Sequence, residues 1–180
     1  MVTPPDIKPL LVVVTGPPGA GKTTTAAVLR DRLRLPLVAK DALKETLASQ
    51  LGTQGRDDSY ELGVAVFHLM ASVVHELLAH DVSLICEGNF VAESVVFRDL
   101  PPTRIAQVHV SAPLEVLRAR LLDRDPHRHP VHYDREAADE IVALAAEGTW
   151  QPLPLAGELI RVDGTRPFDV DELISRIRRM

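Results

Sequence analysis

The chain has 180 residues, of which 46% are hydrophobic and 25% are charged, and its formal net charge is −5. This is ordinary globular usage, and it argues against long disordered segments, collagen-like repeats and disulfide frameworks. The net acidity does not fit the broad basic surface of a dedicated nucleic-acid binder, so nucleic acid is not an expected partner. A lone cysteine, Cys86, is typical of cytoplasmic proteins. No apolar run reaches the roughly 18 residues that span a membrane, and the length predicts one domain over residues 1–180.

Strands and helices are predicted to alternate along the chain. Residues 10–15 are an uninterrupted apolar run rich in β-branched side chains, as expected for a strand buried on both faces of a parallel sheet. Residues 62–78 repeat apolar side chains at intervals of three and four, which indicates a long helix. Further strands are expected at 36–39, 83–87, 104–110 and 158–162, and further helices at 22–35, 42–51, 113–122 and 134–146, with a polar loop at 52–59. Asp169 with Glu172 resembles a capping box that opens the last helix. This order predicts an α/β fold with a five-stranded parallel sheet and helices on both faces.

Ligands of such sheets bind beyond the carboxyl ends of the strands, and the first strand is followed there by a glycine-rich turn. The turn matches G-x-x-x-x-G-K-[ST] in full, with the residues Gly16, Pro17, Pro18, Gly19, Ala20, Gly21, Lys22 and Thr23. Glycines let backbone N–H groups surround a phosphate chain, and the following helix adds its positive dipole end. The motif predicts ATP and Mg²⁺ as cofactors, with Lys22 on the β- and γ-phosphates, Thr23 on the metal and Thr24 near the α-phosphate.

Two acidic residues at strand ends narrow the class of P-loop protein. The D-x-x-G and N-K-x-D motifs of GTPases do not occur, and the chain is short for a large ATPase machine. Glu87 closes the apolar strand at 83–87, where a Walker B acid is expected, although it could also be a strand-end acid paired with Lys22. Asp41 follows the second strand beside the phosphate loop, where an acceptor hydroxyl could meet the γ-phosphate; the alternative is a helix cap before residue 42. The pattern favours a small phosphoryl-transfer enzyme.

Three segments, residues 16–23, 38–41 and 85–90, resemble the small P-loop kinases. These are the AAA-domain kinase-like proteins grouped with zeta toxin, gluconate kinase, chloramphenicol phosphotransferase and the polynucleotide 5′-kinase domain. The resemblance covers nearly the whole chain and implies the three-layer P-loop fold with an Arg-rich lid. It also implies that Asp41 is the general base for an acceptor hydroxyl and that Glu87 contacts substrate or metal-bound water.

A basic stretch at residues 118–132 is expected to supply the lid, at about 124–134. Arg120 and Arg124 share one helix face, and guanidinium groups suit phosphate oxygens. In the resembled family, arginines in and before the lid close over the nucleotide, which implies this role for Arg120, Arg124 and Arg128. The alternative for Arg120 and Arg124 is pairing within the helix, with Asp123 and with Glu115 or Asp125. Three histidines in the stretch lack zinc-site spacing and are expected to contact substrate or phosphate or to be exposed, namely His127, His129 and His132.

The acceptor is expected to be a small molecule bound near Asp41 and Glu87. Lys44, Asn89 and Phe90 are candidates to contact it, with a solvated lysine and an ordinary core phenylalanine as the alternatives. The leading hypothesis is transfer of the γ-phosphoryl group of ATP to a hydroxyl by a monomer or homodimer. A nucleotide-dependent switch with a protein partner and a nucleotide or nucleic-acid 5′-hydroxyl kinase remain open.

Overall fold

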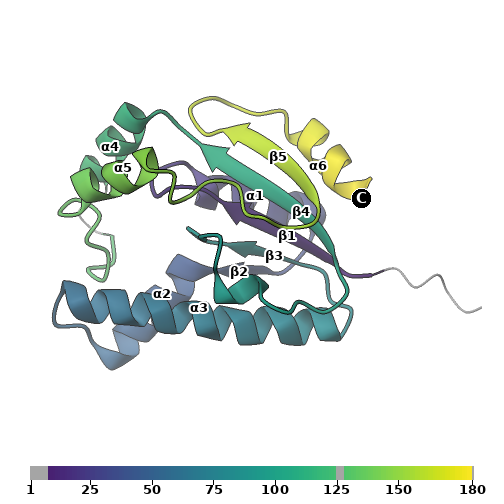
Figure 1. Cartoon of the computed structure of the whole chain (residues 1–180), viewed down its shortest axis with the longest axis horizontal. Helices are drawn as coiled ribbons and strands as arrows, with labels where there is room; N and C mark the ends of the chain where they lie inside the picture. Colours follow the sequence, from purple (N-terminus) through teal and green to yellow (C-terminus); the bar gives the residue numbers. More distant parts are fainter. Residues whose placement is uncertain (1–7, 125–127, 180) are drawn as a thin grey trace, which may run out of the picture.

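The computed structural model describes residues 8–124 and 128–179, and a five-stranded parallel sheet lies at its centre. The sheet has the order β2-β3-β1-β4-β5. Its strands are β1 (Leu10–Thr15), β2 (Leu37–Ala39), β3 (Leu84–Glu87), β4 (Arg104–Ser111) and β5 (Glu158–Asp163). The helices are α1 (Lys22–Leu33), α2 (Lys40–Leu51), α3 (Arg56–Ala79), α4 (Leu114–Leu122), α5 (Ala138–Ala146) and α6 (Val170–Arg178), with a 3-10 turn η1 (Val95–Phe97). The predicted fold class is confirmed, and the carboxyl ends of the strands point toward α4 and α5 (Figure 1).

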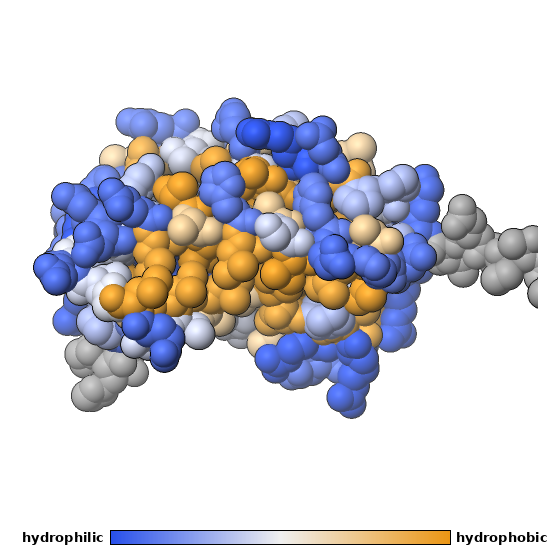
Figure 2. All heavy atoms as spheres, turned by 90° about the horizontal axis from the view of Figure 1, so that it is seen from below, coloured by the Kyte–Doolittle hydropathy of each residue, from blue (hydrophilic) through white to orange (hydrophobic). Residues whose placement is uncertain are grey.

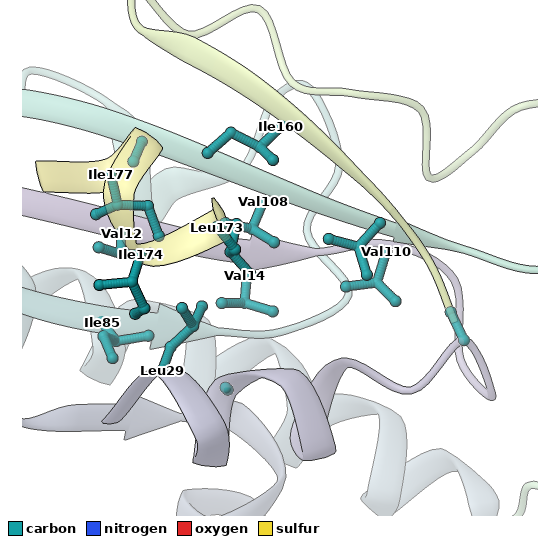
Figure 3. Packing of buried hydrophobic residues seen from close by; sticks show 14 of the residues in the cluster. Val12, Val14, Leu29, Ile85, Val108, Val110, Ile160, Leu173, Ile174 and Ile177 are labelled. Carbon is teal, nitrogen blue, oxygen red and sulfur yellow. The ribbon is translucent and has the colours of Figure 1, made fainter. Parts of the chain in front are cut away.

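The two faces of the sheet carry separate hydrophobic clusters. Val12 and Val14 of β1 face one cluster, which α1 and α6 cover with residues such as Leu29 and Ile174 (Figure 3). The alternate residues of β1, Leu11 and Val13, face the other cluster, which includes apolar side chains of α3 and η1. Because both faces of the sheet are covered, β1 is apolar from Leu10 to Val14 and is buried along its whole length, Thr15 included.

Several element boundaries differ from those predicted. Helix α2 begins at Lys40, two residues early, and α3 begins at Arg56, six residues early. The polar start of α3 carries two acids in its first turn, which the helix dipole favours, so the polar loop predicted there is shorter. Helix α5 begins only at Ala138 because residues 134–137 form turns beside the basic stretch. The cap predicted for α6 is confirmed, since the Asp169 carboxylate accepts from Glu172 N at 2.9 Å.

Helix α3 divides its apolar residues between the core and the surface. Val66, Met70 and Val74 are fully buried against the sheet, whereas Val64 and Leu69 are 44% and 39% exposed. Apolar side chains gather on the face of the molecule where α3 lies (Figure 2). Among the described residues, α3 is also the helix that is long and apolar enough to cross a membrane by length and composition, a test that core helices of soluble proteins also pass. One face of α3 packs against the sheet, and 22% of its apolar 18-residue window is buried.

Candidate active site

A cavity of about 1010 Å³ lies beyond the carboxyl ends of the strands. Its wall includes most of the residues that the sequence singles out: Pro18, Gly19, Gly21, Lys22, Thr23, Thr24, Asp41, Lys44, Glu87, Asn89, Arg120, Arg124 and Arg128. Gly16, Pro17 and Ala20 lie behind this surface as buried parts of the same phosphate loop. The topology therefore brings residues from the loop, α2, β3 and the basic stretch to one place.

The glycines of the phosphate loop are required by its backbone. Gly16, Gly19 and Gly21 have φ angles of +138°, +83° and +103°, a region that residues with a side chain rarely adopt. A Cβ on Gly16 would lie 2.0 Å from the backbone oxygen of Val110 in β4. Gly21 ends the loop as the N-cap of α1 and supplies no side-chain cap. The first turn of α1 therefore presents backbone N–H groups to the cavity, as an anion site requires.

Lys22 is buried at the start of α1 with no carboxylate partner at ion-pair distance in the described chain. Its Nζ donates to the backbone oxygen of Pro17 at 2.9 Å. Burial lowers the pKa of Lys22, although the charges of Glu87 and Asp41 oppose the shift. A buried ammonium held by one carbonyl is poorly compensated, and a phosphate group would compensate it better.

Glu87 lies beside Lys22 and Thr23 at the end of β3. Its side chain is buried, and burial raises its pKa, while the charge of Lys22 and a hydrogen bond with the Thr23 side chain act in the opposite direction. A threonine hydroxyl and a carboxylate oxygen are both ligands that Mg²⁺ accepts. Among the described residues, no group of three or more His, Cys, Asp and Glu side chains forms a metal site.

Asp41 stands in the first turn of α2 among positive charges. Its carboxylate accepts from Arg128 Nη2 at 2.7 Å and lies 3.2 Å from Lys40 Nζ. Burial alone would raise the pKa of Asp41, but the charges of Lys40, His132, Arg128 and Lys22 outweigh it and lower the pKa to about 2. Asp41 is therefore an anion at neutral pH. The capping alternative is wrong, because α2 already begins at Lys40 and its N-cap position precedes Asp41.

The predicted lid arginines have different partners in the described chain. Arg124 and Arg128 both form ion pairs with Asp134, and Arg128 also reaches Asp41. Asp134 was not among the residues predicted for the site, although an acid directly after a basic stretch is a usable signal. Arg120 instead donates to the backbone oxygens of Gly19 at 3.0 Å and Gly164 at 2.8 Å. Arg120 thus braces the phosphate loop and forms no ion pair among the described residues. The helix face predicted to be shared by Arg120 and Arg124 is wrong, because α4 ends at Leu122 and Arg124 lies beyond it.

Two histidines of the basic stretch contact α2. His132 lies 2.7 Å from the Glu45 carboxylate, and His129 forms a hydrogen bond with the Ser49 hydroxyl. His127 lies outside the described residues, as do the predicted lid residues 125 and 126. The stretch is therefore joined to α2 by Arg128, His129 and His132 together.

Asn89 and Phe90, both predicted to contact the acceptor, lie in different environments. Asn89 lines the cavity, whereas Phe90 is fully buried between Phe67 and Phe97 on the α3 side of the sheet. The structure places Phe90 in the core, outside the cavity wall, because its ring fills the space beneath Gly88, where a Cβ would lie 3.0 Å from the ring. A strand-end phenylalanine is compatible with either position in the sequence, and only the packing distinguishes them.

Gly164 supports the phosphate loop from the turn after β5. A Cβ on this residue would lie 1.8 Å from the backbone oxygen of Ala20. We expect Gly164→Ala to displace the loop, lower the free energy of unfolding by about 1–3 kcal/mol and weaken nucleotide binding. Denaturant unfolding and titration with a non-hydrolysable ATP analogue measure both effects. Gly55→Ala is the matched control, because no atom of the described residues lies within 4 Å of its Cβ position. Equal effects of the two variants would contradict the packing role.

A glycine-built phosphate loop with a buried lysine, at the carboxyl edge of a parallel sheet, defines the class of P-loop nucleotide-binding proteins. The chain belongs to the AAA domain family, whose model matches residues 12–141, and this family groups with P-loop kinases.

Individual relatives are kinases as well. The crystal structure of a provisionally assigned kinase from Chloroflexus aurantiacus J-10-fl is similar to this chain, with a TM-score of 0.83 and 32% sequence identity. The alignment covers 96% of this chain and 98% of that one. The cytidylate kinase of Azotobacter vinelandii is 32% identical over 92 residues, which are 50% of this chain and 40% of the relative. The chain thus spans well under half of that relative's length. A sugar kinase from Janibacter sp. HTCC2649 shares the fold, at 24% identity and a TM-score of 0.59 over 94% of this chain and 91% of the other.

Proposed function

We propose that the protein transfers the γ-phosphoryl group of ATP to a hydroxyl group of a small molecule. The observation that carries this proposal is that Asp41, an ionised carboxylate, lines the same cavity as the phosphate-loop lysine, Lys22. One side of the cavity can hold phosphate, and the other holds a group that accepts a proton. That is the minimum a hydroxyl kinase requires.

The cavity residues fit ATP and Mg²⁺. The backbone of residues 16–21 would surround the phosphates, Lys22 would neutralise their charge, and Thr23 with Glu87 would hold the metal directly or through water. When bound, ATP supplies the phosphoryl group and Mg²⁺ neutralises part of its charge. Arg124 and Arg128 lie in the proposed lid, residues 124–134, and would exchange Asp134 for phosphate oxygens. The whole chain is proposed to act as one kinase domain.

Asp41 would orient the acceptor hydroxyl and take its proton. The bond from the hydroxyl oxygen to the γ-phosphorus forms while the bond from that phosphorus to the leaving ADP oxygen breaks, and the hydroxyl proton passes to Asp41. A carboxylate with a pKa near 2 is a weak base, but it suffices because the hydroxyl becomes acidic only as it bonds to phosphorus. The carboxylate has about four lone-pair sites, so its bonds to Lys40 and Arg128 leave room for the acceptor.

The charge of Asp41 also bears on the type of acceptor. A phosphate acceptor, of the kind a cytidylate kinase uses, would bring a second negative charge next to this carboxylate, and like charges at short range repel. A hydroxyl group forms a hydrogen bond there instead. Asp41 therefore favours a hydroxyl over a phosphate as the group that receives the phosphoryl.

Incubation with isotopically labelled ATP, Mg²⁺ and a panel of metabolites tests the proposal, with products read by mass shift. The expected result is a gain of one phosphoryl group on a hydroxyl compound and none on CMP. Phosphorylation of CMP as the preferred acceptor would contradict the hydroxyl assignment. ATP hydrolysis that responds to a protein and to no hydroxyl compound would support a nucleotide-dependent switch instead.

A further inference from the structure

Lys44 is a buried ammonium group in the cavity wall that has only a neutral partner in the described chain. Its side chain leaves α2 one turn after Asp41, and the residue is 7% exposed. The Nζ atom donates to the Ser59 hydroxyl at 2.7 Å, and Ser59 in turn donates to the backbone oxygen of Val131 at 2.6 Å. No described carboxylate lies within 4.0 Å of it. The sequence alternative of a solvated surface lysine is therefore wrong.

The basic side chains of the cavity wall differ in whether they form an ion pair. Most of them form an ion pair with a described carboxylate, namely Lys40, Arg56, Arg124, Arg128, His132 and Arg166. Lys22, Arg120 and Lys44 do not, and each donates to a neutral oxygen instead. Lys22 and Arg120 belong to the phosphate loop and its support. Lys44 resembles Lys22 in being a buried cation that donates to a neutral oxygen. It lies outside the phosphate loop, one helical turn from Asp41.

Lys44 can reach a ligand from the cavity, because it lines the same wall as Asp41. On its other side it packs against Gly63 of α3, where a Cβ would be in van der Waals contact with Nζ at 3.8 Å. Residues three apart on a helix lie on one face, about 5–6 Å apart at Cβ. An acceptor with its hydroxyl at Asp41 would therefore place the next few atoms of its skeleton near Lys44.

Building on the phosphotransferase function proposed above, we propose that Lys44 binds an acidic group of the acceptor. The substrate is then a small compound that carries both a hydroxyl and a carboxylate or phosphate group. The hydroxyl lies at Asp41 and the acidic group at Lys44. The anion supplies the negative partner that this buried cation lacks in the described structure.

The electrostatics of the pocket agree with this geometry. Burial lowers the pKa of Lys44 to about 8, helped by the charges of Lys40 and Arg128 and opposed by those of Asp41 and Asp134. Ser59 and Gly63 from α3 contribute no charge. An anion bound at Lys44 would stabilise the charged form and return the pKa toward its ordinary value. Binding at a pH above 8 should therefore take up a proton.

Calorimetric titration tests the proposal on the full-length protein with Mg²⁺ and AMP-PNP already bound at the phosphate loop. The probes are matched pairs of acidic and neutral compounds: glycerate and glycerol, gluconate and glucitol, and glucose 6-phosphate and glucose. We expect an acidic member to bind at least tenfold more tightly than its neutral counterpart, and the carboxylate and phosphate pairs tell the two acidic groups apart. Lys44→Met should remove that preference and leave the affinity for AMP-PNP unchanged, whereas Lys8→Met, an equal change of charge at an exposed site, should keep it.

Proton uptake on binding of the acid distinguishes a lysine that binds the ligand from one with only a structural role. Titrations at pH 8.5 in buffers of different ionisation enthalpy should show uptake by the wild-type protein and none by Lys44→Met. The wild-type measurement also decides the question if the variant does not fold. Equal binding of acidic and neutral members, or no binding of any acid while AMP-PNP is bound, would overturn the proposal.

The failure of this proposal can be distinguished from that of the proposed function. Phosphoryl transfer to a neutral hydroxyl compound, with no transfer to its acidic counterpart, overturns the role of Lys44 and leaves the hydroxyl kinase intact. Failure to bind AMP-PNP, or transfer to CMP alone, overturns both.

Discussion

Lys22→Ala is expected to reduce the rate of phosphoryl transfer by about 100- to 1,000-fold, or roughly 3–4 kcal/mol of transition-state stabilisation. The reason is that Lys22 is a buried cation, aimed at the phosphate loop and held in place by the backbone oxygen of Pro17. It requires little reorganisation when charge develops on the transferred group. Steady-state turnover with the acceptor found by the metabolite panel measures the effect.

The melting temperature of Lys22→Ala shows whether a loss of turnover comes from unfolding. Lys22 has no carboxylate partner at ion-pair distance in the described chain, so its removal breaks no direct ion pair and should change the melting temperature little. Lys8→Ala, at an exposed position, is the control for the change of net charge. Turnover close to that of the wild-type protein would show that the phosphate-loop assignment is incorrect.

Asp41→Asn is expected to lower acceptor phosphorylation by about 100- to 10,000-fold, the range ascribed to a positioned acid or base. The amide has the same shape but cannot take the hydroxyl proton. ATP binding should change little, because the phosphate loop and Lys22 are untouched. Turnover with saturating acceptor and a separate titration with AMP-PNP distinguish the two steps.

The substitution at Asp41 also removes a partner of Arg128, so a second variant is needed. Asp134→Asn removes the carboxylate shared by Arg124 and Arg128 and leaves Asp41 in place. We expect its effect on turnover to be at least tenfold smaller than that of Asp41→Asn. Similar losses in the two variants would assign the effect to the lid, and full activity of Asp41→Asn would remove Asp41 as the base.

The sheet and the phosphate loop could be predicted because their determinants are local. A strand buried on both faces carries apolar side chains on both, and β1, which is apolar from Leu10 to Val14, was predicted with its observed bounds. The loop requires glycine where φ is positive, and Gly16, Gly19 and Gly21 stand at those positions. The cap of α6 was also found from two residues three apart. In each case one short segment contains the whole physical requirement.

The acceptor side could be predicted only in part, because its contacts join distant segments. Arg128 reaches Asp41 across 87 positions of sequence, and Ser59 reaches Val131 across 72. Sequence spacing identified Lys44 as a candidate but not its burial, and it could not exclude Phe90, which packs in the core. Asp134 was missed because its importance comes from the two arginines that converge on it.

The sequence by itself therefore determined the fold class and the phosphate-binding chemistry of this protein. Backbone amides, glycine conformations and one lysine make up that site within a single turn, so their order along the chain is sufficient. The tertiary structure alone decided which charges are paired, which lysines are buried without a carboxylate partner and which side chains face the cavity. These properties depend on burial and on distances between α2, α3 and the basic stretch, and such distances arise only when the chain packs.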